Sequence, residues 1–137
     1  MTNLGAILFA RNLDSVPRLG RKALRIILYR GTNRVETIRE WKGTQGYAAA
    51  YEAGINWIQN QLPLNEEIRN AFRREEKTYP ELAIRELLAN ALIHQDFSMT
   101  GAGPMVEIFT DRMEITNPGV LPGVNHFCQL RHSFLPT

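Results

Sequence analysis

The stretch "PMVEIFTDRMEITNPG" (Pro104–Gly119) alternates apolar and polar residues on both sides of a short polar break at Asp111-Arg112. The apolar residues that share one side before and after the break are Val106, Ile108, Met113 and Ile115. A period of two around a turn predicts a β-hairpin. Asn117-Pro118-Gly119 then interrupts regular structure, so the predicted hairpin covers Met105–Thr116.

A helix is predicted immediately before this hairpin, over Pro80–Gln95. Thr78 is placed to cap it, Pro80 falls in its first turn, and Glu81 follows Thr78 by three residues, which predicts a capping box. At 100° per residue, one face of the helix is apolar and is the predicted core face. This face comprises Ile84, Leu87, Leu88, Ala91 and Leu92.

The rest of the chain alternates between helical and extended patterns. We predict helices over Thr2–Ala10 and Gln45–Leu62, a buried strand within Ala23–Gly31, and weaker strands near Val35 and Ile68. The predicted fold class is therefore α+β: a two-layer sandwich with the helices packed on one face of a mixed or antiparallel sheet.

Length and composition indicate a single intracellular domain. The chain has 137 residues, 44% of them hydrophobic and 22% charged, and a net charge of +2 that is too small to argue for nucleic acid. Cys128 is the one cysteine, which fits a reducing cytoplasm. No apolar run approaches the ~18 residues of a membrane helix, so we expect a cytoplasmic location and no membrane partner. We assign residues 1–122 to one module and leave 123–137 as a tail without a firm period.

The helix before the hairpin carries a line of polar residues at every fourth position: Glu86, Asn90 and His94. The line lies about 120° from the centre of the core face and is bordered by Leu82, Ala83 and Ile93. Unpartnered burial would cost about 1–3 kcal/mol for each polar group, so the line must face a pocket, a partner or solvent. The plain alternative is a surface Glu86, a His94 that favours the helix C-terminus, and a tolerated Asn90.

These residues carry a family resemblance. "YPELAIRELLANALIHQDFS", followed by "VEIFTDRMEITNPGVLP", resembles the ATPase-like module of RecG-related transcriptional regulators, as do "TNLGAILFA" and "YRGTNRVETI" nearer the N-terminus. That module is a divergent member of the gyrase, Hsp90, histidine kinase and MutL (GHKL) ATPase superfamily. In those proteins it follows an Alba-like DNA-binding domain, so the resemblance implies a piece of a longer chain that reaches DNA through an upstream domain.

The resemblance also implies roles for individual residues. Glu86 would be the catalytic carboxylate that positions water, and Asn90 would bind Mg²⁺ bridging the phosphates of ATP. The remaining nucleotide-binding positions would be His94, Asp96, Asn117 and Gly119. A homo-oligomer is compatible with the sequence.

The sequence departs from the family pattern at two places. Asn117 stands where active members carry an adenine-binding Asp, and no glycine-rich lid follows before Thr137. We therefore expect a Mg-ATP-binding regulatory module rather than a complete ATPase. The alternative is a non-catalytic structural or oligomerisation module that retains this helix for packing. No GxxxxGK[ST] phosphate loop is present.

A basic run near the N-terminus leaves two interpretations open. Arg18, Arg21, Lys22 and Arg25 could contact a nucleic-acid backbone, or they could belong to a solvated loop followed by a strand.

Overall fold

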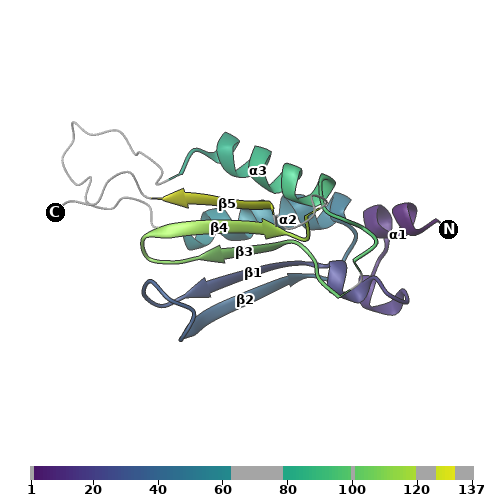
Figure 1. Cartoon of the computed structure of the whole chain (residues 1–137), viewed down its shortest axis with the longest axis horizontal. Helices are drawn as coiled ribbons and strands as arrows, with labels where there is room; N and C mark the ends of the chain where they lie inside the picture. The colour runs from purple at the N-terminus through teal and green to yellow at the C-terminus, as the bar shows by residue number, and fades with distance from the viewer. Residues whose placement is uncertain (1, 63–78, 100, 120–125, 132–137) are drawn as a thin grey trace.

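The protein is an α+β two-layer sandwich built on one mixed sheet (Figure 1). The computed structural model describes residues 2–62, 79–99, 101–119 and, for the backbone, 126–131. The strand order is β2-β1-β3-β4-β5. The strands are β1 (Leu24–Tyr29), β2 (Thr37–Gly43), β3 (Met105–Ile108), β4 (Arg112–Asn117) and β5 (His126–Arg131). The helices are α1 (Asn3–Phe9), α2 (Tyr47–Gln61) and α3 (Glu81–Ile93).

A parallel pair lies at the centre of the sheet. Arg25 pairs with Met105 and Leu28 with Ile108 in β1–β3, whereas the other neighbouring strands pair antiparallel. The predicted hairpin is confirmed as β3–β4. The strand predicted near Ile68 lies outside the described residues, and β5 occupies a segment in which we predicted no element.

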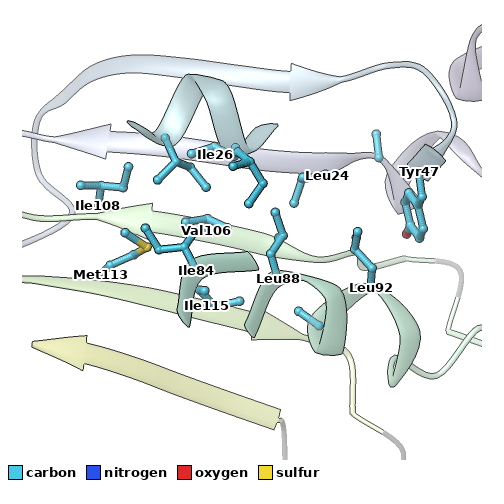
Figure 2. Packing of buried hydrophobic residues seen from close by; sticks show 14 of the residues in the cluster. Leu24, Ile26, Tyr47, Ile84, Leu88, Leu92, Val106, Ile108, Met113 and Ile115 are labelled. Carbon is cyan, nitrogen blue, oxygen red and sulfur yellow. The ribbon is translucent and has the colours of Figure 1, made fainter. Parts of the chain in front are cut away.

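The core lies between the helices and one face of the sheet. The strands contribute Leu24, Ile26, Val106, Ile108, Met113 and Ile115. The predicted core face of α3 is confirmed, because Ile84, Leu88, Ala91 and Leu92 are buried and Leu87 packs against them. Figure 2 shows Ile84 and Leu88 directed towards the strand residues. α2 contributes Ile55 and Ile58 to the same cluster.

The helix termini follow local sequence signals, with one correction. Thr2 caps α1 by accepting a hydrogen bond from the Gly5 amide at 3.1 Å. The predicted capping box of α3 is wrong: Pro80 is the N-cap and makes no side-chain cap bond. Its extended backbone (ψ 131°) delays the first helical residue to Glu81, so Glu81 cannot occupy the third helical position that a capping box requires. Within the described ranges, no helix has the length and apolarity to cross a membrane.

Two arginine side chains cover acidic residues on the second face of the sheet, which we call the outer face. Glu107 and Glu114 on β3 and β4 are only 2% and 4% exposed. Arg34 donates to Glu107 at 2.6 and 3.1 Å and to Glu114, while Arg112 donates to Glu114 at 2.7 Å. Both guanidinium groups also lie over the ring of Phe109, 5.3 and 3.8 Å from its centroid. Charge pairing and ring contacts thus let a polar strand face remain buried.

We predict that Arg34→Ala lowers the free energy of unfolding by about 2 kcal/mol, because Glu107 loses both bonds from this guanidinium while remaining buried. Arg30→Ala is the matched control, since Arg30 pairs with Glu36 at 3.3 Å and both side chains are more than half exposed. That variant should change stability by under about 0.5 kcal/mol. Urea unfolding measures both, and equal losses would contradict the assigned role of Arg34.

Candidate functional site

The polar line of α3 is open to solvent. Glu86, Asn90 and His94 are all exposed, and so are the neighbouring Leu82 (75%) and Ile93 (65%). Because these residues are spaced four positions apart, the Cβ atoms of successive members lie about 5–6 Å apart on one side of the helix. The three polar side chains therefore do not pack in the core. The apolar side chains of Leu82 and Ile93 beside them are exposed as well.

Asp96 lies just beyond the helix and organises the loop there. Its Oδ1 accepts hydrogen bonds from the Ser98 amide at 2.9 Å and the Ser98 hydroxyl at 2.6 Å. These bonds, with a smaller contribution from the charge of Lys22, hold the pKa of Asp96 below its usual value. The Asp96 amide donates to the Pro118 carbonyl at 2.7 Å. Asp96 thus meets the segment that follows β4.

Lys22 approaches the same loop from the N-terminal half of the chain. It is 1% exposed, its Nζ donates to the Asp96 carbonyl at 3.1 Å, and it lies 6.0 Å from the centroid of the Phe97 ring. Burial lowers the pKa of Lys22, and the nearby Asp96 charge partly offsets that effect. Lys22 therefore does not belong with the solvated cations of the basic run.

Asn117 connects the end of β4 to the last turn of α3. It is 5% exposed, and its Nδ2 donates to the Ala91 carbonyl at 3.0 Å. Its Oδ1 is buried and accepts no hydrogen bond from the residues that the structure describes. Gly119, two residues later, is partly exposed. The structure therefore brings Asn117, Pro118-Gly119 and Asp96 together at the C-terminal end of α3. The polar line extends from this end towards the N-terminus of the helix.

Gln95 and Tyr47 form a buried polar contact that the sequence patterns did not reveal. Gln95 Nε2 donates to the Tyr47 hydroxyl at 2.7 Å and to the Leu92 carbonyl at 3.0 Å. The Tyr47 hydroxyl donates to the Lys22 carbonyl at 2.6 Å. Gln95 and Asn117 thus satisfy carbonyls of the last helical turn that the helix itself leaves without partners. The available signal was a polar residue at the end of the predicted helix, but its partner Tyr47 is distant in sequence.

Two hollows lined by described residues are prominent, and neither of them is lined by Glu86, Asn90 or His94. One, of about 380 Å³, is apolar and lies between α1, α2 and α3, with Leu8, Tyr51 and Ile93 on its walls. The other, of about 780 Å³, lies between residues 14–21 and 101–105 and also touches the first residues of β1 and the end of β2. In the described ranges, no three His, Cys, Asp or Glu side chains converge on a point that could hold a metal.

Comparisons with known proteins bear on the fold. No protein-family model matches the chain, and no curated protein matches it. The crystal structure of the DIP2311 protein from Corynebacterium diphtheriae is similar, with a TM-score of 0.65 and 18% identity over 90% of this chain. The chain spans only 24% of the length of that protein. At this identity the likeness shows a shared fold and nothing about activity.

We predict that Asn117→Asp destabilises the protein by about 2–3 kcal/mol at neutral pH, because a carboxylate would face the Ala91 carbonyl and the negative end of α3. Asn60→Asp in the exposed last turn of α2 is the matched control. This variant places a negative charge at a helix C-terminus without removing a buried hydrogen bond, so its free energy of unfolding should fall by only about 0.5 kcal/mol. Chemical unfolding at pH 7 measures both, and equal losses would show that the Asn117 bond is unimportant.

We also predict that stability falls between pH 10 and 12. Burial raises the pKa values of Tyr47 and Tyr79 to about 12, from 10.0 when exposed. In this window the unfolded chain releases the two protons while the folded chain keeps them, so unfolding becomes easier as the pH rises. Each group contributes on the order of 2 kcal/mol by pH 12. Tyr47→Phe should remove the contribution of that tyrosine to the alkaline loss, and an unchanged dependence of the melting temperature on pH would contradict the assignment.

Proposed function

We propose that this domain is a Mg-ATP-binding regulatory module of a RecG-related, DNA-linked protein, and that it is not a complete ATPase by itself. The observation that carries the proposal is the exposed Glu86–Asn90–His94 line, which ends beside the buried Asn117. An exposed carboxylate, amide and imidazole on one side of a helix are free to meet a ligand.

Asn117 supports a base-recognition role beside its structural one. Its Nδ2 donates to the Ala91 carbonyl, whereas its Oδ1 is buried and accepts no hydrogen bond within the described part of the chain. An amide oxygen accepts the kind of hydrogen bond that the exocyclic amino group of adenine donates. The amide thereby offers the acceptor that an aspartate provides in the resembling family, without placing a charge at the helix C-terminus.

The residues present fit a magnesium ion that arrives with the nucleotide. Mg²⁺ prefers oxygen ligands and is commonly held by one or two protein groups together with phosphate oxygens. Asn90 offers an exposed amide oxygen, and Glu86, one turn earlier, an exposed carboxylate. When bound, the ion would neutralise charge on the phosphates. Asn90 would hold it, and Glu86 would orient a water or an ion ligand.

The test is a Mg-ATP titration followed by amide NMR on the 137-residue chain. We expect shifts at Glu86, Asn90, His94 and the Asn117–Gly119 segment, and about tenfold weaker binding for Asn90→Ala, which corresponds to about 1.4 kcal/mol. Because Asn90 acts through the ion, the Asn90→Ala effect should vanish when Mg²⁺ is omitted. An absence of shifts at millimolar nucleotide would overturn the proposal.

Asn56→Ala provides the matched control. Asn56 is exposed on α2, so the substitution makes the same chemical change on another helix. It should leave nucleotide binding unchanged. Both variants should melt at or slightly above the wild-type temperature, since Ala is the better helix former.

The alternative is a non-catalytic structural or oligomerisation module. It is favoured by the hydrogen bonds that Asp96 and Asn117 already make within the fold. A clearly lowered melting temperature for Asn90→Ala, with no nucleotide-induced shifts in the wild type, would support this alternative.

A further inference from the structure

The larger hollow is a basic groove on the outer face, which we define by Arg18, Arg21, Arg25, Lys42 and the segment Gly101–Met105. Arg25 alternates with the core residues Leu24 and Ile26 on β1, so it points to the outer face. The groove holds about 780 Å³ and is separate from the polar line of α3.

The charge in this groove is unbalanced. Lys42 is paired with Asp14, which also lines the groove, at 2.9 Å, and Arg25 is paired with Glu40 at 2.7 Å. Arg18 and Arg21 are exposed and make no ion pair with any residue in the described ranges. The guanidinium groups of Arg18 and Arg21 are therefore available to bind an anion. The carboxylates that pair with Arg25 and Lys42 beside them are partly exposed.

The walls that carry these cations are held close together. A Cβ at Gly103 would lie 2.2 Å from the Arg21 carbonyl oxygen, so only glycine allows the two backbones to approach so closely. The Arg25 amide also donates to the Pro104 carbonyl at 3.2 Å. Arg21 is thus fixed against the loop before β3 rather than mounted on a free segment.

The lining favours phosphate over base recognition. Arginine donates two parallel hydrogen bonds to a phosphate, which suits a phosphodiester backbone. None of the described residues that line the groove carries an aromatic ring on which a base could stack. A contact of this kind orients a nucleic acid without reading its sequence.

We propose that the basic groove binds the phosphodiester backbone of nucleic acid, with Arg18 and Arg21 as the principal phosphate contacts. The contact is independent of nucleotide binding at α3. It would give this domain its own contact with nucleic acid, one that does not depend on base sequence. Each phosphate neutralised should contribute about −0.9 to the slope of log affinity against log salt concentration.

The test is fluorescence anisotropy of a short labelled DNA duplex with the 137-residue chain at low salt, without ATP or Mg²⁺. For the wild type we expect weak binding and a salt slope of about −2 or steeper. The double variant Arg18→Gly with Arg21→Gln should bind at least about tenfold more weakly and lose about 2 from the slope. Arg11→Gln with Arg39→Gln removes the same charge from two exposed arginines outside the groove and should bind like the wild type.

Arg18→Gly is chosen because it should not disturb folding. Arg18 has φ 69°, a conformation that glycine adopts without strain. The melting temperature of the Arg18→Gly variant should match or exceed that of the wild type. Arg21→Gln alone serves as a second groove variant. The proposal is overturned by no duplex binding at low salt or by equal losses in the Arg11 and Arg39 control. Displacement of the duplex by millimolar inorganic phosphate at constant ionic strength would instead indicate a small-anion site and also overturn it.

Discussion

The parallel pairing of β1 with β3 is the constraint on which the rest of the structure depends. It joins Leu24–Tyr29 to Met105–Ile108, so the intervening chain must cross over the sheet. α2 and α3 lie in that crossover and share the apolar face with α1. Because β4 returns antiparallel to β3, its last residue, Asn117, ends beside the last turn of α3. The candidate nucleotide site is a direct product of this topology.

Polar groups at the end of α3 serve the fold and the candidate site together. Asn117 and Gln95 satisfy helix carbonyls, while Lys22 and Asp96 fasten the loop that follows. By contrast, Glu86, Asn90 and His94 contribute little to packing, since they are exposed. The proposed nucleotide site therefore combines a hydrogen-bonded end, where substitution should affect stability, with an exposed line, where substitution should have little effect on folding.

The sequence predicts those parts of the structure that rest on local periodicity. The alternation in β3–β4, the helix α2 and the apolar face of α3 were predicted correctly, and the position of the polar line on α3 followed from its spacing. The contacts that could not be predicted are non-local: Arg34 with Glu107, Lys22 with Asp96, and Asn117 with Ala91. Lys22 looked like a solvated cation because neither its burial nor its partner is encoded nearby. β5 lacks a clear period, and its strand conformation follows from pairing with β4.

The composition of β2 has a consequence for how this sheet can associate. β2 lies at one end of the strand order, and most of its residues are exposed, including Arg39, Glu40 and Lys42. A free strand edge invites pairing with strands of other molecules, and a row of charged side chains makes such pairing unfavourable. The charged side chains of β2 thus protect this margin of the described sheet from uncontrolled growth into larger β-assemblies.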